Sequence, residues 1–560
     1  MSQAVGNEAN ASESAASGIV AGGIAASEGG VLDPYQLDPR TAPAFPAAAR
    51  ASMGDAQLRR NVRHATNVIQ AKRARVVAEM PDWQELRTAG EAIRRHTMQH
   101  LDFYLEEFER NCTAAGGHVH WARDAEEARR IVVELVKKSG GGGAAATEVI
   151  KIKSMTTEEI QLNRALEAAG VHAYETDLAE LIIQLGHDQP SHIVVPALHK
   201  NRAQIREIFQ REMDLPELGS TPEDLADAAR RFLREKFLRV KTAVSGANFL
   251  IAETGGVCIV ESEGNGRMCL TLPETLISVA GIDKVIPRYQ DLEVLLQLLP
   301  RSATGERMNP YNSIWTGVDK TGSGEGNDGP RTFHVVLMDN ARTEILADKE
   351  ARQTLYCIRC AACQNACPVY QQTGGHAYGS VYAGPIGAIL TPQLMEMHHA
   401  QSLPYASSLC GACYEVCPVK INIPEVLIHL RHKVVEQQTA GLRILTNPEA
   451  VALKAAGAVF RNETVFRASQ KLGRLAELPL ARKDTEGVGW IDWLPGMLGG
   501  WTQMRDLREM PKQTFREWFE QRGQSAAGRR ASDRESNDSG EEEGATRRDD
   551  GERRRAGDER

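Results

Sequence analysis

Apolar residues recur at intervals of three and four positions from about Gln57 to Ala115, and this spacing predicts amphipathic helices. Further along the chain, short apolar segments alternate with helical patterns. The predicted helices run up to Val136, begin near Thr157 and span 177–185. The predicted strands lie at 118–121, 149–154, 172–175 and 191–197. Because this alternation is typical of parallel strands joined by right-handed crossovers, we predict an α/β domain.

The stretch 244–274 predicts a β-hairpin within the same domain. Its segments FLIAET and GVCIVES flank the glycine pair at 255–256, which favours a tight turn between two strands. The Asn-Gly pair at 265–266 predicts a second turn. Cys258 and Cys269 are then expected on strands, as small buried side chains.

Two glycine-rich segments of the α/β region are predicted to be loops. The glycine run at 140–143 precedes a strand, whereas a phosphate-binding loop follows a strand and opens a helix, so we predict a flexible surface insertion. The polar loop 317–333 follows a predicted helix at 291–299 and leads into a predicted strand at 334–340. The α/β domain is expected to end near Asp348.

Downstream of the cysteine-rich region the pattern becomes helical again. A helix is predicted to begin with Pro424 in its first turn. The region 440–520 starts helical and then carries three closely spaced tryptophans within 489–501, which we expect to pack as a cap on another domain. The predicted divisions are a disordered extension (1–55), the α/β domain with its N-terminal helices (56–348), a helical ferredoxin-type domain (349–435), a mainly helical C-terminal region (436–520) and a disordered charged tail (521–560).

Composition narrows the classes of protein. The chain has 560 residues, 42% of them hydrophobic and 25% charged, as expected for a globular protein of two or three domains. The net charge of -8 argues against nucleic acid as the main partner. No lysine or arginine precedes Arg40, and no stretch approaches 18 uninterrupted apolar residues, so neither an export signal nor a transmembrane helix is expected. We therefore expect a cytoplasmic protein with reduced thiols.

Seven of the ten cysteines fall in two runs that end in Cys-Pro. The first run has the spacing C-x2-C-x2-C-x3-C-P, which is typical of bacterial [4Fe–4S] ferredoxins, and the second is shorter. Zinc sites favour paired C-x2-C knuckles, and disulfides need an oxidising compartment, so both alternatives fit this spacing less well. The cysteines of the two runs are Cys357, Cys360, Cys363 and Cys367, followed by Cys410, Cys413 and Cys417.

Two-cluster ferredoxins exchange their last ligand between the runs. With that exchange, Cys417 completes a first cluster with Cys357, Cys360 and Cys363. The second cluster receives Cys367, Cys410 and Cys413. It is one thiolate short, because Ser407 stands where the fourth cysteine of its run is expected. The second centre is then either [3Fe–4S], or [4Fe–4S] closed by Ser407, water or another side chain.

Other candidate site residues are less specific. Glu253, Glu261 and Glu263 lie near the ends of the predicted hairpin strands, where they can line a cleft or be solvated turn residues. His376 and Tyr378, between the two cysteine runs, can donate hydrogen bonds near a cluster or fill the loop. Spacing alone does not separate these alternatives.

The segment GGHAYGSVYAGPIGAIL (374–390), set between CIRCAACQNACPVY and SLCGACYEVCPVKI, resembles the iron–sulfur subunit of the bacterial lactate-utilisation system, the LutB family. The resemblance extends upstream through KIKSMTTEEIQLN, ETDLAELIIQL, SGANFLIAETGG and GPRTFHVVLMDN and covers roughly 60–520. It implies a LUD domain with a fold like the NagB, ribose-5-phosphate isomerase and CoA-transferase group, followed by a ferredoxin module with two clusters. It also implies that serine at position 407 belongs to the family's own pattern.

The resemblance further implies a function. Members of this family work with two partner proteins to oxidise L-lactate to pyruvate, so the leading hypothesis is an electron-transfer subunit of that complex. One rival hypothesis places catalysis on the hydroxy acid in the α/β domain itself, although no flavin or nicotinamide fingerprint is evident. Another makes the chain a scaffold or redox sensor whose clusters are structural.

Overall fold

The computed structural model describes residues 37–140, 146–318, 329–440, 447–502 and 505–522. The chain divides into two compact units, 1–438 and 439–560. The glycine run and most of both predicted tails lie outside the described residues. Within the described part of the chain, no helix is both long and apolar enough to cross a membrane.

Within the described residues four helices precede the first strand, the last three of them where the apolar spacing predicts helices. They are α1 (Phe45–Gly54), α2 (Ala56–Ala78), α3 (Trp83–Gln99) and α4 (Leu101–Ala114). Helix α1 differs from the prediction, because composition assigned its residues to a disordered extension. Its Phe45 is buried, with its ring 4.9 Å from that of Tyr378, so a contact distant in sequence orders this segment.

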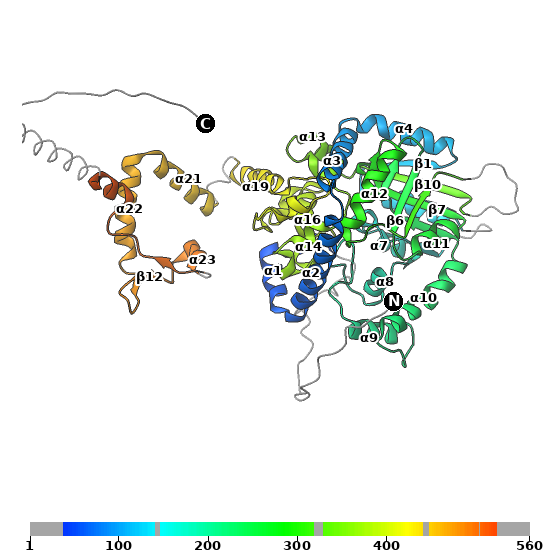
Figure 1. Ribbon diagram of the computed structural model, residues 1–560, viewed down its shortest axis with the longest axis horizontal. Helices are drawn as coiled ribbons and strands as arrows, with labels where there is room; N and C mark the ends of the chain where they lie inside the picture. The colour runs from blue at the N-terminus through cyan, green and yellow to red at the C-terminus, as the bar shows by residue number, and fades with distance from the viewer. Residues whose placement is uncertain (1–36, 141–145, 319–328, 441–446, 503–504, 523–560) are drawn as a thin grey trace, which may run out of the picture. The chain divides into compact units, whose positions relative to one another are not determined.

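The centre of the first unit is a six-stranded, fully parallel sheet with the order β1-β10-β7-β4-β2-β3. Three neighbouring strands, β1, β10 and β7, run side by side in Figure 1. The predicted α/β class is therefore present. In the same order, the strands are His118–Ala122, Thr332–Met338, Thr275–Gly281, Thr242–Ser245, Glu148–Lys151 and His172–Glu175.

Helices between these strands cover the sheet. Alternate residues of its buried strands face opposite sides: Val336 belongs to one apolar core with α5 and α7, and Val335 to the other. The second core continues into the cysteine-bearing segments. The helices between strands that contact this sheet include α5 (Ala125–Lys138), α6 (Met155–Glu159), α7 (Leu162–Ala168) and α8 (Leu178–Leu185). Further along this part of the chain are α9 (Arg202–Glu212), α10 (Pro222–Arg239), α12 (Tyr289–Ala303) and α13 (Arg342–Ala347).

The predicted hairpin is confirmed, but the second turn is not. Strands β5 (Phe249–Ile251) and β6 (Gly256–Glu261) pair antiparallel, and Gly255 has a φ of 66° in the turn between them. With β8 (Val285–Ile286) and β9 (Tyr311–Trp315) they form a four-stranded sheet. The Asn-Gly pair instead opens helix α11 (Asn265–Thr271), which carries Cys269, so the prediction that Cys269 lies on a strand is wrong.

The apolar segment 191–197 is not a strand, contrary to its predicted state. Its polar groups bond to the cysteine-bearing region instead. The carbonyl of Ser191 accepts from the Tyr370 hydroxyl at 2.7 Å, and the Ile193 N–H donates to Gln364 Oε1 at 3.2 Å. Burial lowers the pKa of His192 to about 3, so its neutral Nδ1 accepts two backbone N–H groups while Nε2 bonds Asn365. These distant partners, which no local pattern encodes, replace a β-ladder.

Between Asp348 and Thr439 the elements are short helices and turns. The two cysteine runs carry α14 (Ala362–Ala366) and α18 (Ala412–Val416), and α19 (Ile423–Thr439) follows them. Helix α2, in blue, lies against this region, which is drawn in yellow-green (Figure 1). The intervening helices are α15 (Tyr370–Thr373), α16 (Gly384–Leu390) and α17 (Met397–Ala400).

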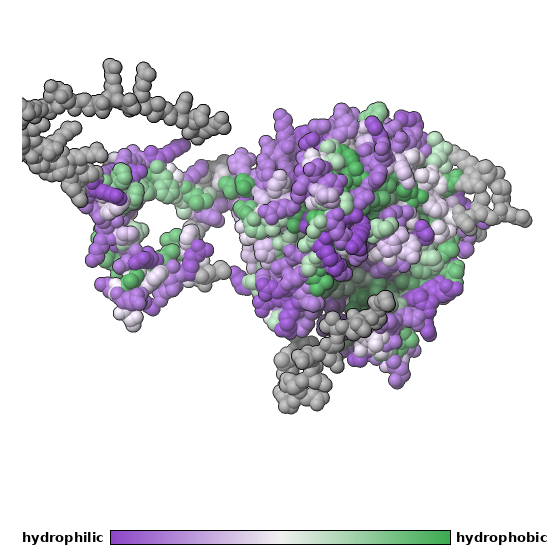
Figure 2. Space-filling view, in the orientation of Figure 1, coloured by the Kyte–Doolittle hydropathy of each residue, from purple (hydrophilic) through white to green (hydrophobic). Residues whose placement is uncertain are grey.

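The second unit combines helices with a small sheet. Its strands β11 (Arg482–Lys483), β12 (Gly489–Ile491) and β13 (Leu507–Arg508) pair antiparallel. Three tryptophans, at 490, 493 and 501, keep 38–59% of their surface exposed, and their predicted packing on another domain stays a prediction. In Figure 2 the visible face of the first unit is mostly hydrophilic, with smaller apolar patches. The second unit includes the helices α21 (Pro448–Arg461), α22 (Glu463–Glu477) and α23 (Gly499–Thr502), and residues 515–522 are helical too.

A glycine at the contact with segment 191–197 has no room for a side chain. A Cβ on Gly375 would lie 2.0 Å from the Ser191 carbonyl oxygen. We expect Gly375→Ala to lower the free energy of unfolding of the first unit by about 1–3 kcal/mol, because backbone must move to relieve the clash. Urea unfolding under nitrogen measures the change. The control is Gly54→Ala, since a Cβ at Gly54 meets nothing within 4 Å, and equal effects of the two substitutions would contradict the prediction.

Candidate functional site

The two cysteine runs share one backbone conformation. In the first run, Arg359 and Ala361 on either side of Cys360 have positive φ angles of 61° and 60°. In the second run, the residues on either side of Cys410 do the same, with φ angles of 54° at Leu409 and 84° at Gly411. Left-handed residues in such turns direct backbone N–H groups into a shared concavity, which suits an anion or an iron–sulfur group.

One group of thiols combines both runs. Burial raises the pKa of Cys360, and the neighbouring thiols of Cys417 and Cys357 raise it further. Burial also raises the pKa of Cys363, again with contributions from Cys357, Cys360 and Cys417. The pKa of Cys417 rises to about 11 through burial, with a further contribution from Cys357. Because interactions between charges weaken with distance, Cys417 lies beside three cysteines of the other run.

The remaining three thiols form a second group. Burial raises the pKa of Cys413 to about 12, and Cys367 and Cys410 add to the effect. Burial raises the pKa of Cys367 as well, with a contribution from Cys410. The two groups adjoin, since Cys413 also acts on Cys363. Cys410 is exposed, whereas the other six cysteines of the runs are buried.

Backbone N–H groups are directed at several of these sulfurs. The N–H of Arg359 donates to Cys357 Sγ at 3.4 Å, and that of Ile421 donates to Cys417 Sγ at 3.3 Å. None of the seven cysteines is in a disulfide. Thiols in two groups, with N–H donors and nearby cations, have the chemistry that iron–sulfur clusters need. The residues present therefore fit two such clusters.

Ser407, three residues before Cys410, is not assigned as a cluster ligand by its contacts. Its Oγ accepts the N–H of Leu409 at 3.1 Å. This hydrogen bond tightens the turn before Cys410 and leaves the fourth ligand of the second group open.

Arginines of the N-terminal helices hold the second run. Arg87 on α3 donates from Nε to the Cys417 carbonyl at 2.9 Å and from Nη2 to the Tyr414 carbonyl at 3.1 Å. Arg73 on α2 donates to the Val416 carbonyl at 3.1 Å. The positive charges of both arginines act on Cys417, where a thiolate ligand is expected. The amphipathic pattern predicted these helices but gave no sign of these roles.

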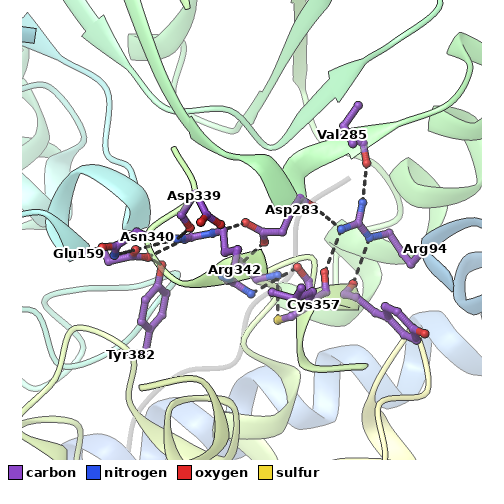
Figure 3. A network of polar contacts seen from close by, with 12 residues as sticks. Arg94, Glu159, Asp283, Val285, Asp339, Asn340, Arg342, Cys357 and Tyr382 are labelled. Carbon is purple, nitrogen blue, oxygen red and sulfur yellow. Dashed lines mark hydrogen bonds and ion pairs between the residues drawn. The ribbon is translucent and has the colours of Figure 1, made fainter. Parts of the chain in front are cut away.

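A buried polar network joins the first run to the α/β domain (Figure 3). Arg342 bonds Asp283 through Nε at 2.6 Å and Glu159 through Nη2 at 2.8 Å. Tyr382 donates to the same Glu159 at 2.6 Å. Arg359, inside the first run, lies 3.4 Å from Asp283 and over the Tyr382 ring at 5.1 Å.

Arg94 on α3 completes this junction. Its guanidinium donates to four backbone carbonyls, those of Asp283 and Val285 after strand β7 and those of Leu355 and Tyr356 before Cys357. Arg94 is almost fully buried. One side chain therefore fixes the start of the first cysteine run against the end of the central sheet.

A cavity of about 510 Å³ adjoins this junction. Its charged lining comes from segments that follow strands of the parallel sheet, from the end of β6 and the turn after it, from the first cysteine run, from α2 and from the segment after α12. The charged residues along it are Lys72, Lys153, Asp177, Glu261, Glu263, Lys284, Glu306 and Arg359.

The carboxylates predicted to line a cleft separate in the structure. Glu261 and Glu263 border the cavity, whereas Glu253 accepts the N–H of Tyr289 at 2.9 Å, at the start of α12. His376 lies elsewhere, where its Nε2 bonds the Gln189 carbonyl at 2.8 Å. Sequence reasoning did not identify Lys284 or Arg359. The position of Arg359 inside the first run was the available signal, and Lys284 had none.

Three protein families match the chain in succession. The LUD domain matches residues 105–338, a 4Fe-4S dicluster domain matches 353–421, and the C-terminal domain of lactate utilisation protein B matches 429–524.

Full-length relatives carry the corresponding name. Lactate utilization protein B 1 of Bacillus mycoides is 44% identical over 471 residues, covering 84% of this chain and 94% of the relative. Lactate utilization protein B of Bacillus subtilis is 42% identical over 455 residues, or 81% and 91% of the two chains. A crystal structure of a DUF162 family protein from Deinococcus radiodurans covers 42% of this chain and 98% of its own at 15% identity, with a TM-score of 0.23.

Proposed function

The chain belongs to the lactate utilisation protein B family, and from this premise we propose that it is the iron–sulfur electron-transfer subunit of a complex oxidising L-lactate to pyruvate. Two partner proteins complete the complex, which allows lactate to serve as a source of carbon and energy. The observation that carries the proposal is the pair of thiol groups assembled from both cysteine runs.

The ligands follow from that grouping. The first cluster is held by Cys357, Cys360, Cys363 and Cys417. The second is held by Cys367, Cys410 and Cys413, with a fourth ligand from outside the cysteine runs or an open corner. A [4Fe–4S] cluster bound at either place supplies one-electron transfer. The matching turns of the two runs and the N–H donors to Cys357 and Cys417 support this assignment.

The architecture is proposed to follow the family as well. Residues 56–348 form a LUD domain with a fold like the NagB, ribose-5-phosphate isomerase and CoA-transferase group. Residues 349–435 form an all-helical ferredoxin module, and 436–520 form the C-terminal region. The protein is expected to work in the cytoplasm, where cysteine ligands stay reduced.

The proposal is tested with cluster-loaded protein under nitrogen. With its partner proteins present, adding L-lactate should bleach the visible absorption of the clusters, because reduction of iron–sulfur centres lowers that absorption. D-lactate is the control that tests whether the reduction is specific for the L enantiomer. A mixture that stays oxidised with L-lactate, yet is reduced by dithionite, would contradict the proposed function.

Arg359 is expected to set the potential of the first cluster. Its backbone N–H bonds Cys357 Sγ, and its guanidinium is buried beside the same cysteine. Arg359→Gln should lower the midpoint potential by about 50–100 mV, because a nearby positive charge favours the reduced form, which carries one more electron. Redox titration followed by EPR measures the shift. Arg123→Gln, at an exposed arginine, should leave both potentials unchanged, and an unshifted Arg359→Gln would refute the role.

A further inference from the structure

The cavity beside the first cysteine run lies where α/β proteins bind ligands. Its floor includes residues that directly follow three parallel strands: 152–156 after β2, Asp177 after β3 and 246–248 after β4. Ligands of open α/β sheets occupy the crevice outside the carboxyl ends of the strands. Arg359 of the first cysteine run also lines the cavity. Because Arg359 also bonds the Cys357 carbonyl, a ligand in the cavity that contacts Arg359 is close to the first group of thiols.

Lys284 is a second cation that lines the cavity. It is 7% exposed, and among the described residues its ammonium has no hydrogen-bond or ion-pair partner. Burial and the charge of Arg359 lower its pKa to about 7, although Asp283 acts in the opposite direction. Its side chain lines the cavity, so an anion bound there would supply the acceptor that the ammonium lacks.

Arg359 also has unused capacity. Its Nε is buried without a partner, and its two other hydrogen bonds, to the Cys357 carbonyl and to Asp283, are both long at 3.4 Å. A guanidinium with free N–H groups binds carboxylates well, because its donors match the spacing of the two oxygens. Two under-satisfied cations thus line the cavity, close enough for the charge of Arg359 to act on Lys284.

The carboxylates of the cavity are already engaged. Asp177 accepts two backbone N–H groups at the start of α8, and Glu263 accepts the N–H of Leu178 at 3.0 Å. Glu261 accepts N–H groups from the turn that follows it, including that of Gly264 at 2.6 Å. These anions have partners, whereas Lys284 does not. Burial and the neighbouring Asp177 raise the pKa of Glu263 to about 7, so the unmet demand for negative charge is at Lys284 and Arg359 and not throughout the cavity.

We propose that this cavity binds a small organic carboxylate, a 2-hydroxy or 2-oxo acid, with its carboxylate on Lys284 and Arg359. The choice of acid rests on the proposed function, which makes lactate and pyruvate the available members of this class. The volume of about 510 Å³ exceeds what a three-carbon acid fills, so the acid occupies the cationic end and longer acids are accommodated too.

Calorimetric titration of the cluster-loaded chain, alone and under nitrogen, tests the site. L-lactate or pyruvate should bind at concentrations up to about 10 mM, above the usual range of KM values. L-lactamide, which keeps the shape and loses the charge, should bind at least roughly tenfold more weakly, since a charged hydrogen bond is lost. Absence of binding by both acids, or equal binding of the amide, would overturn the proposal.

A pair of matched variants locates the site. Lys284→Met keeps an unbranched chain and removes the charge, and it should weaken acid binding by at least roughly tenfold. Lys72→Met is the control, because Lys72 borders the same cavity but is 48% exposed and lies 4.0 Å from Glu306. The control should change binding by less than about twofold. Equal effects of the two substitutions would place the acid elsewhere.

The test of the cavity and the test of the proposed function can fail independently of each other. Titration needs no partner protein, whereas reduction by L-lactate requires the partners. If the clusters are reduced but the chain alone binds no acid, the cavity proposal fails and the proposed function stands. If the chain binds acid but is never reduced by L-lactate with its partners, the reverse holds. Should Lys284→Met lose its iron, the comparison of acid and amide on the unmodified protein still decides.

Discussion

Replacing Cys417 by alanine is expected to remove the cluster of the first cysteine run, although Cys417 belongs to the second. Its thiol lies with those of Cys357, Cys360 and Cys363. A cubane that loses one of four thiolates is poorly held, so iron should fall from about eight to about four atoms per chain if both centres are [4Fe–4S]. Iron and sulfide analysis measures the loss. EPR of the dithionite-reduced protein then identifies the remaining centre.

The comparison of four variants distinguishes exchanged ligands from unexchanged ones. Cys417→Ala and Cys357→Ala should lose the same EPR signal. Cys410→Ala should lose the other. Cys258→Ala, at a buried cysteine of strand β6, should keep all the iron and serves as the control. If Cys417→Ala matched Cys410→Ala instead, each run would serve its own cluster and the proposed ligand sets would be wrong.

Replacing Arg342 by methionine is expected to destabilise the first unit by about 3–5 kcal/mol, because it leaves two buried carboxylates without their main partner. Asp283 and Glu159 both bond this arginine, and all three side chains are almost fully buried. Urea unfolding of the cluster-loaded protein under nitrogen measures the loss. Arg307→Met is the control, since Arg307 pairs with Glu79 at the surface and should contribute less than about 1 kcal/mol.

The same pair of proteins should show a defined pH dependence. Burial alone would raise the pKa of Asp283 and of Glu159, but the charge of Arg342 outweighs it and lowers both. Carboxylates with lowered pKa stabilise the fold fully above their unfolded pKa, near 4, and lose that contribution as the pH falls through the folded value. The difference between the original protein and Arg342→Met should therefore shrink below about pH 4. A difference that grows in acid would contradict the ion-pair explanation.

The local pattern of apolar residues and glycines predicted much of the fold. The alternation of apolar segments and helices identified strands β1, β2, β3 and β10, and the glycine pair at 255–256 identified the hairpin. The central strand β7 was missed, since all of its residues are buried and its sequence therefore shows no alternation of apolar and polar positions. Segment 191–197 was assigned wrongly for a related reason. Its apolar run suits a strand, but its hydrogen-bond partners are supplied by residues more than 170 positions away.

The sequence by itself determined the kind of chemistry, because cysteine spacing within a tight turn is a local property that needs no long-range contact. It also predicted the two sets of thiols, through the ligand exchange of two-cluster ferredoxins. It did not predict the arginines that bond the second run, nor that Lys284 and Arg359 line one cavity. Those pairings depend on how α2 and α3 pack on the cysteine runs and how the runs meet the sheet. Only the tertiary structure decided them, since burial and charge pairing arise from segments far apart in the sequence.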